Sequence, residues 1–392
     1  MAMQIPGFAS YKERHGITSR SVIEPGLERM ERVLDKLGHP ERFSKVVHVA
    51  GTNGKGSTIA FMKALCEAHS ISYGAFQSPA IVDVHDQIVV DGQAITSEEL
   101  DAVMTKIAQV PEAKELTDFE LLTICAFVHF QHKAPEVWII ETGMGGRFDS
   151  TNVIPKSVAV ITSLSLDHTN FLGTTLDSIG YHKAGIIKSH SNVFVPSTIY
   201  LPPIEQQVNE VQATLHSLEP FGSQVKLSLL GEHQRMNATL AVHALESLFD
   251  LDPKKVELGL KQAYIPFRME KIADNVYMDG AHNGASARSL VETIRTEFPG
   301  QPIHIVLGIL KDKDFEGVLR LFEEIADCMT FVEFSHERAL EPIRLVELCH
   351  INEFSVTDVQ NLDINTLKNE KFKTFVTGSL YFLSEWRFKN RI

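Results

Sequence analysis

The segment VVHVAGTNGKGSTIAF, residues 46–61, constrains the fold of this chain more than any other stretch. Its first five residues, Val46–Ala50, are mostly β-branched and predict a short, buried parallel strand. Three glycines then fall between residues 51 and 56, where a tight turn can expose backbone N–H groups, and Thr58–His69 can continue as a helix. A strand, a glycine turn and a helix N-terminus together form an anion site. The segment therefore predicts a βα unit that binds phosphate.

The glycine turn departs from the common nucleotide-binding pattern G-x-x-x-x-G-K-[ST]. No glycine stands five positions before Gly54, and Gly56 follows Lys55 where Ser or Thr is usual. We expect Lys55 to place a positive charge on the phosphates, and Ser57 or Thr58 to bring a hydroxyl near a metal. The alternative is an ordinary glycine-rich βα turn that binds nothing. Three glycines and a lysine in one corner are costly unless a ligand approaches the backbone closely, which favours an NTP site.

Strands and helices alternate along the chain, as in an α/β fold with a doubly wound, mostly parallel sheet. Strands are predicted at Val46–Val49, Tyr73–Phe76, Val137–Ile140, Val158–Thr162, Val193–Pro196, Val276–Met278, Ile303–Leu307, Met329–Val332 and Thr374–Val376. Helices are predicted between them, for example at Glu24–Leu37, Ser97–Ile107, Asp118–Gln131, Met236–Phe249 and Ala285–Glu297. A helix ends and a proline interrupts near Tyr264–Arg268, before a second βα series begins. We therefore expect a P-loop domain at residues 1–266 and a smaller Rossmann-like α/β domain at residues 267–392.

Composition argues for a soluble cytoplasmic enzyme. The 37 basic and 50 acidic residues give a net charge of −13, which argues against general binding to the nucleic-acid backbone. An anionic substrate must therefore meet a locally positive cleft. The four cysteines are widely spaced without a C-x-x-C pattern, so we expect reduced thiols. No apolar stretch approaches 18 residues and the N-terminus carries early charges, so neither a membrane span nor secretion is expected.

Further polar motifs follow the predicted strands, where parallel sheets place their ligands. ETGMGGRFDSTN begins with Glu141, a carboxylate that can hold Mg²⁺ or, alternatively, merely cap a helix. SLSLDHTNFLG places Asp167 and His168 after the next strand. An isolated histidine is usually structural, but a Glu and a His beside a phosphate loop favour a metal site. In FQSPAIVDVH, Ser78 could offer a hydroxyl to the same metal, although Ser-Pro alone indicates only a turn.

Taken in order, these motifs resemble those of the Mur ligase superfamily and, within it, the folylpolyglutamate synthase/dihydrofolate synthase family. The resemblance is carried by HVAGTNGKGS, LTDFELLT, ETGMGGRFDSTN, SLDHTNFLG, HKAGIIK, GEHQRMNA, DGAHN, LGILKDKD and VTGSLYFLSEWR, and it covers nearly the whole chain. It explains the unusual loop, because G-T-N-G-K-G-S is that family's own spacing. It implies an ATP-dependent ligase that adds L-glutamate to a folate, to dihydropteroate, or to both, through an acyl phosphate. A cytoplasmic monomer with ATP and two Mg²⁺ ions is implied, and K⁺ is allowed.

The resemblance also assigns residues to the catalytic machinery. Ser78 and Glu141 would bind the first Mg²⁺, Glu141 and His168 the second, and Lys55 the phosphates. Lys183 in HKAGIIK would be carbamylated, which turns a cation beside the metals into an anion that supports them. The alternative for Lys183 is an ordinary solvated helix lysine.

The remaining assignments concern ATP and the folate. For ATP, the resemblance implies Gly54, Lys55, Gly56 and Ser57 at the phosphates, Asn237 at the adenine, Arg268 at the phosphates, Asp279 at the ribose and His282 nearby. For the pterin side it implies Glu24, Leu27, Thr117, Phe119, Glu120, Phe148, Asp149 and Ser150. Phe119 could stack on the ring.

Some positions depart from the family pattern. Ala80 stands where the family has His, Gln87 where it has Arg, His182 where it has Glu, Phe267 where it has Gly, and Gly284 where it has Pro. The ATP and metal residues persist, whereas part of the folate loop does not. A cell-wall Mur ligase and a P-loop regulator or simple NTPase are the rival interpretations. LTDFELLT and GRFDSTN favour the folate branch over the first, and a requirement for glutamate and a pterin would exclude the second.

Overall fold

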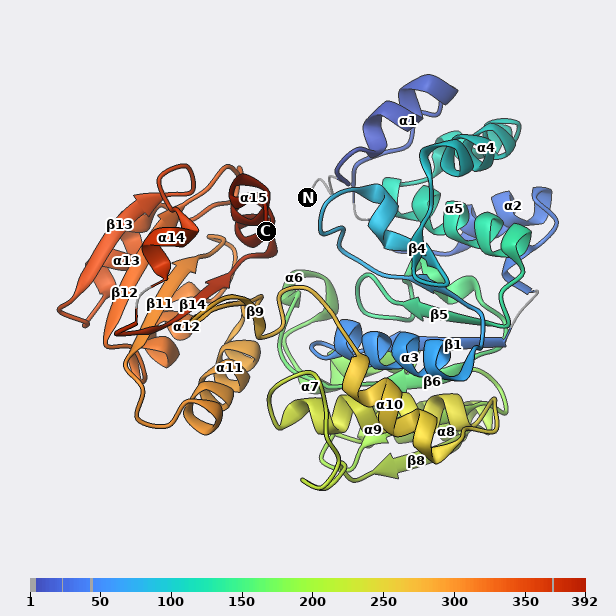
Figure 1. The fold of residues 1–392 in the computed structure, drawn as a ribbon. Coiled ribbons are helices and arrows are strands. Elements are labelled where there is room, and N and C mark those ends of the chain that lie inside the picture. Colours follow the sequence, from blue (N-terminus) through green and yellow to red (C-terminus); the bar gives the residue numbers. More distant parts are fainter. Residues whose placement is uncertain (1–4, 23, 43–44, 369) are drawn as a thin grey trace. The chain divides into compact units, whose positions relative to one another are not determined.

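The computed structural model describes residues 5–22, 24–42, 45–368 and 370–392, which form two compact units (Figure 1). The first unit comprises Met1–Ser228 and Arg235–Ala263, and the second comprises Leu229–Gln234 and Tyr264–Ile392. The main division therefore lies three residues before the predicted boundary at 266/267. The short segment 229–234, which belongs to the second unit, was not anticipated from the sequence.

The first unit is built on an eight-stranded sheet in the order β4-β3-β2-β5-β1-β6-β7-β8. The strands are β1 Lys45–Ala50, β2 Tyr73–Phe76, β3 Ile88–Val90, β4 Gln93–Ala94, β5 Val137–Glu141, β6 Val158–Ile161, β7 Asn192–Pro196 and β8 Thr214–Leu218. The six strands β2, β5, β1, β6, β7 and β8 are neighbours in this order and pair in parallel. Strands β3 and β4 extend the sheet beyond β2 with antiparallel pairing. Because β1 lies between β5 and β6, the loops after these three strands end at one edge of the sheet.

Helices flank this sheet (Figure 1). They are α1 Phe8–His15, α2 Glu28–Lys36, α3 Lys55–His69, α4 Ser97–Ala108, α5 Asp118–Lys133, α6 Thr169–Leu172, α7 Leu176–Ala184, α8 Pro202–Val211, α9 His233–Glu246 and α10 Pro253–Gln262, with 3₁₀ turns η1 Pro40–Arg42, η2 Val84–Gln87, η3 Pro111–Glu115 and η4 Ser150–Val153. One core cluster joins α2, α4 and α5 to side chains of β1, β2 and β5. A second joins β6 and β7 to α8.

The second unit contains a six-stranded sheet in the order β13-β12-β11-β14-β10-β9. Its strands are β9 Glu270–Ala273, β10 Val276–Asp279, β11 Ile303–Gly308, β12 Cys328–Glu333, β13 Phe354–Asp358 and β14 Lys373–Gly378, and its helices are α11 Gly284–Glu297, α12 Phe315–Glu323, α13 Pro342–Leu348, α14 Ile364–Leu367 and α15 Leu380–Asn390. Only β9 runs antiparallel to its neighbour. Both units are thus mostly parallel α/β sheets, and the predicted fold class is confirmed.

Every strand predicted from the sequence forms, and the predicted helices form with shifted ends. The helix predicted from Glu24 begins only at Glu28, because Pro25 and Gly26 interrupt it and Gly26 has a φ of 136°. The helix after the phosphate loop begins at Lys55, three residues earlier than predicted. Five strands were missed, namely β3, β4, β8, β9 and β13.

All four cysteines are free, as expected. Within the described ranges, no helix combines the length and the apolar character that crossing a membrane requires.

Candidate active site

A small cavity lies where the loops after β1, β5 and β6 meet. It is lined by Gly51, Thr52, Lys55, Gly143, Met144, Gly145, Asp167, His168, Leu172 and Lys183. Its volume of about 30 Å³ is on the scale of one ion or water. Three loops predicted to carry the chemistry therefore converge on one point, at the edge of the sheet where parallel strands bind ligands.

The phosphate loop is a tight turn that requires glycine at two positions. Gly54 caps α3 with a φ of 88°, and a Cβ there would lie 2.6 Å from Asn237 Oδ1. A Cβ at Gly51 would lie 1.9 Å from Thr162 Oγ1. Thr162 in turn donates a hydrogen bond to Asn53 O at 2.6 Å, which ties the loop to the end of β6. The predicted turn and helix N-terminus are present, with Gly56 and Ser57 in the first turn of α3.

Lys55 and Glu141 face each other beside this turn. Lys55 Nζ donates to Gly51 O at 3.0 Å and lies 3.9 Å from Glu141 Oε1. Glu141 ends β5 directly opposite Val49 of β1, and it is buried. Glu141 is therefore a buried carboxylate beside the phosphate loop, and a carboxylate oxygen is a ligand that Mg²⁺ prefers.

The other proposed metal ligands are placed less tightly. His168 has a left-handed φ of 49°, lines the cavity and is largely exposed. Ser78 is half-buried just beyond β2 and is not among the described residues that line the cavity. Among residues 5–22, 24–42, 45–368 and 370–392, no three His, Cys, Asp or Glu side chains gather as a metal site. Mg²⁺ is commonly held by one or two carboxylates with water and phosphate oxygens, so a site built on Glu141 fits this ion.

Lys183 is a buried lysine in the wall of the cavity. It lies in the last turn of α7, and its side chain is only 4% exposed. Burial, together with the charge of Lys55, lowers the pKa of Lys183 to about 7, while Asp167 and Asp149 act in the opposite direction. A substantial fraction of this amine is therefore neutral near neutral pH. The interpretation of Lys183 as a solvated helix lysine is wrong.

Asp149 accepts hydrogen bonds that hold the backbone of the loop after β5. Asp149 Oδ2 accepts from Met144 N at 2.8 Å, and Oδ1 accepts from Thr151 N at 3.1 Å and Thr151 Oγ1 at 2.5 Å. Burial raises the pKa of Asp149, and these hydrogen bonds oppose that rise. The same loop packs closely on α7, since a Cβ at Gly146 would lie 2.7 Å from His182 O. Asp149, predicted to contact the substrate, thus positions the loop that lines the cavity.

Asn237 in α9 lies against the phosphate loop. Its side chain is buried, and Oδ1 lies 3.4 Å from Thr58 Oγ1. The structure therefore brings this predicted ATP residue to the start of α3.

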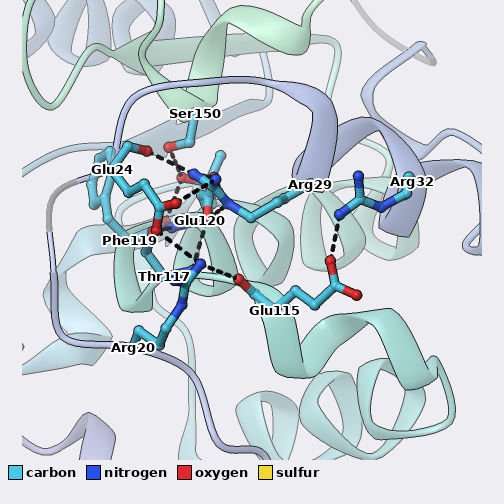
Figure 2. A network of polar contacts seen from close by, with 10 residues as sticks. Arg20, Glu24, Arg29, Arg32, Glu115, Thr117, Phe119, Glu120 and Ser150 are labelled. Carbon is cyan, nitrogen blue, oxygen red and sulfur yellow. Dashed lines mark hydrogen bonds and ion pairs between the residues drawn. The ribbon is translucent and has the colours of Figure 1, made fainter.

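The predicted pterin-side residues form a second cluster, organised by an arginine that the sequence did not single out (Figure 2). Arg29 of α2 donates to Glu120 Oε1 at 2.9 Å and to Glu24 O at 2.7 Å. Glu120 also accepts from Thr117 N at 2.7 Å, which completes a capping box at the start of α5. Arg20 pairs with Glu24 at 2.8 Å. The partly buried guanidinium of Arg29 thus joins Glu24 to the N-terminus of α5.

One aromatic side chain, Phe119, borders this cluster. Phe119 stacks on Phe76 with ring centroids 5.8 Å apart, and a Cβ at Gly143 would lie 2.6 Å from the Phe119 ring. Phe119 therefore links the cluster to the cavity-lining loop. Phe148 is 45% exposed and meets the ring of His182 edge-on.

The other predicted pterin residues lie close to this cluster. Ser150 is buried and hydrogen-bonds Thr123 Oγ1 at 3.0 Å. Leu27 caps α2.

Three predicted ATP residues gather in the second unit. Asp279, at the end of β10, accepts from Met269 N at 2.9 Å, and burial raises its pKa to about 6 against the effect of Arg268. Arg268 packs against Gly280, because a Cβ at Gly280 would lie 2.5 Å from Arg268 Nη1. His282 Nδ1 donates to Gly280 O at 2.8 Å. The cluster lies at the carboxyl end of a parallel strand, as expected for a nucleotide contact.

Three of the residues that depart from the family pattern have defined surroundings in the structure. Gln87 is buried and donates to Gln77 O at 3.1 Å, so it supports the strand end near Ala80. Phe267 is buried despite a φ of 60°, and its N–H donates to Glu270 Oε2 at 3.0 Å. Gly284 begins α11 with open space around its Cα.

Comparison with known proteins decides the family. Residues 49–201 match the Mur ligase middle domain, and residues 267–366 match the Mur ligase glutamate ligase domain. The dihydrofolate synthase/folylpolyglutamate synthase of Bacillus subtilis is 35% identical, over 93% of this chain and 95% of that protein. The chain belongs to the folylpolyglutamate synthase/dihydrofolate synthase family. As a member of this family it is an enzyme of the ligase class, and the rival interpretation as a simple P-loop regulator is wrong.

Solved structures of the family have the same fold. Escherichia coli FolC in complex with DHPP and ADP aligns with a TM-score of 0.87 at 27% identity, covering 96% of this chain and 95% of FolC. The Yersinia pestis bifunctional synthase complexed with AMPPNP and Mn aligns with a TM-score of 0.89 at 25% identity, covering 98% of each chain.

Proposed function

We propose that this ligase uses ATP to join L-glutamate to a folate, to dihydropteroate, or to both, through an acyl phosphate. The observation that carries the proposal is that the phosphate loop and the buried Lys183 line one cavity, with Glu141 3.9 Å from Lys55. Phe119 joins the pterin-side cluster to the loop that lines this cavity. Mur-family membership and relatives that bind ADP, DHPP and AMPPNP with Mn support it.

The chemistry explains why the site concentrates positive charge. A carboxylate is a poor acyl donor, because its leaving group would be oxide. An oxygen of the folate carboxylate therefore attacks the γ-phosphorus, ADP leaves, and the glutamate amine then displaces phosphate from the acyl carbon. Carboxylate and γ-phosphate are both anions, and Lys55 with the amides of the phosphate loop offsets their repulsion.

We assign the metal and the carbamate to this chain's own residues. Glu141, His168 and Ser78 would hold two Mg²⁺ ions, which when bound neutralise phosphate charge. Lys183, whose pKa is lowered to about 7, has the neutral amine that reaction with CO₂ requires. The carbamate would be an anion in the wall opposite Lys55. K⁺ remains an allowed further cofactor, and we expect a cytoplasmic monomer that binds no nucleic acid.

We assign the ATP contacts to the phosphate loop, Asn237, Arg268, Asp279 and His282. Residues 1–266 would form the ATP-binding Mur-ligase-like domain, and residues 267–392 the C-terminal Mur-ligase-like domain. The pterin would stack on Phe119, beside Glu24, Leu27, Thr117, Glu120, Phe148 and Ser150. Asp149 would act by holding the loop.

Phosphate release by the purified protein tests the proposal. ATP, Mg²⁺ and L-glutamate are supplied with dihydropteroate, with tetrahydrofolate, or with neither, and the ligated product is identified by mass spectrometry. Phosphate release that requires both glutamate and a pterin supports the proposal, and the effective pterin distinguishes the two activities. Release that proceeds equally without either substrate would refute it.

A further inference from the structure

His48 is a buried histidine in the centre of β1, three residues before the phosphate loop. It is fully buried, and Nε2 lies 2.8 Å from Thr151 Oγ1. Nδ1 is also buried and has no hydrogen-bond partner among the described residues. An unsatisfied buried acceptor costs about 1–3 kcal/mol, so a histidine here needs a reason beyond stability.

The hydrogen-bond directions along this chain of groups are fixed by their chemistry. Asp149 Oδ1 accepts from Thr151 Oγ1 at 2.5 Å, because an ionised carboxylate can only accept. The Thr151 hydroxyl has one proton and donates it to Asp149, so toward His48 it must accept. His48 therefore carries its proton on Nε2 and donates it. Burial and the charge of Lys188 lower the pKa of His48 to about 3, which keeps the ring neutral.

The far end of the chain of hydrogen bonds reaches the cavity. Asp149 Oδ2 accepts from Met144 N at 2.8 Å, and Met144 lines the cavity with Lys55 and Lys183. A donor in the central strand thus orients a hydroxyl, the hydroxyl orients a carboxylate, and the carboxylate fixes the loop. Each bond fixes the orientation of the next group, so loss of the first donor frees the hydroxyl and loosens the carboxylate that holds the loop.

We propose that His48 is a positioning residue that acts through Thr151 and Asp149 to hold the Gly143–Met144 backbone where the reacting phosphate and carboxylate meet. This inference rests on the proposed function for its kinetic consequence, but not for the effect on the loop. The side chain itself touches no substrate. Its unpaired Nδ1 is tolerated because a histidine supplies the Nε2–H donor at the required reach.

Three variants separate positioning from a purely structural role. His48→Leu removes the donor and the unpaired acceptor together, whereas His48→Gln keeps an N–H donor at similar reach. Thr151→Val removes the relaying hydroxyl with little change in volume. Hydrogen exchange of the segment 142–151, kcat, KM for each substrate and the thermal transition are measured for all three and for the double variant.

For His48→Leu we expect faster exchange of the loop and a fall in kcat of about 10- to 100-fold. The KM for ATP and the thermal transition should change little. In His48→Gln, loop exchange and kcat should both return most of the way to their wild-type values. Thr151→Val should match His48→Leu, and the double variant should lose no more than either one.

Unchanged loop exchange in His48→Leu would overturn the inference whether or not the protein ligates. Additive losses in the double variant, or a fall in thermal stability with normal kcat, would also overturn it. Faster loop exchange in His48→Leu, together with a wild-type protein that makes no ligation product, would refute the proposed function alone.

Discussion

Replacing Arg29 with methionine should selectively weaken the pterin-side cluster. The Arg29 side chain is 14% exposed and that of its partner Glu120 is 4% exposed, so the variant leaves a buried carboxylate without its cation (Figure 2). Removing one partner of a buried ion pair typically costs about 3–5 kcal/mol. Glu120 keeps the Thr117 N–H at 2.7 Å and lies at a helix N-terminus, which offsets some of this cost. We therefore expect a loss of about 3 kcal/mol in the free energy of unfolding.

Arg32 provides the matched control. It also pairs with a glutamate, Glu115, but these side chains are 49% and 55% exposed. Exposed pairs contribute about 0–1 kcal/mol, so Arg32→Met should be nearly silent. Adding Glu120→Gln to Arg29→Met removes the uncompensated charge and should recover part of the loss.

Urea unfolding followed by tryptophan fluorescence gives the measurement. The chain has two tryptophans, Trp138 in the first unit and Trp386 in the second, so a common Trp386→Phe background reports the first unit. The KM for the pterin substrate should rise in Arg29→Met, because Glu24 loses its anchor, while the KM for ATP stays constant. Equal stability of Arg29→Met and Arg32→Met would refute the reasoning.

Three further perturbations test the cavity. Lys55→Ala should nearly abolish ligation and leave the thermal transition within a few degrees, and retained ligation would refute the phosphate-loop assignment. Glu141→Gln should lower activity more than His168→Ala across a Mg²⁺ titration, because Glu141 would be shared between two ions, and a silent His168→Ala would remove the second-metal role. The pKa of Lys183 is lowered from 10.5, the value expected in the unfolded chain, to about 7 in the folded protein. Between these pH values the unfolded chain binds one proton more than the folded protein, so the free energy of unfolding rises with pH. The destabilisation caused by Lys183 is therefore greatest below pH 7. In CO₂-free buffer, Lys183→Met should therefore stabilise the protein near pH 6, with an advantage that shrinks toward pH 9, whereas a constant advantage would contradict a buried amine.

Burial and regular spacing decided which parts of the fold could be predicted. The buried central strands, such as β1 and β5, follow from their apolar runs. The missed strands are short or exposed: Thr214–Leu218 has no buried residue, and both residues of Gln93–Ala94 are exposed. Their pairing depends on neighbours distant in sequence, which local patterns do not encode.

The site residues that could be predicted lie in short segments rich in glycine and charged residues. The residues that were missed act through partners far away in the sequence. Gly54, Lys55 and Glu141 stand out because each lies at the end of a strand or in the loop after it. Arg29 looked like any helix-surface arginine, and its partner Glu120 is 91 positions away. His48 and Thr151 are separated by 103 positions, so only the fold reveals that they form one chain of hydrogen bonds with Asp149.

Transfer of oxygen from the folate to phosphate tests the acyl-phosphate mechanism most directly. Tetrahydrofolate or dihydropteroate labelled with ¹⁸O in the reacting carboxylate is ligated to glutamate, and the released phosphate is analysed by mass spectrometry. Because a carboxylate oxygen attacks the γ-phosphorus and leaves with it, we expect one ¹⁸O atom in each phosphate from fully labelled substrate. Unlabelled phosphate formed together with ligated product would contradict an acyl-phosphate route.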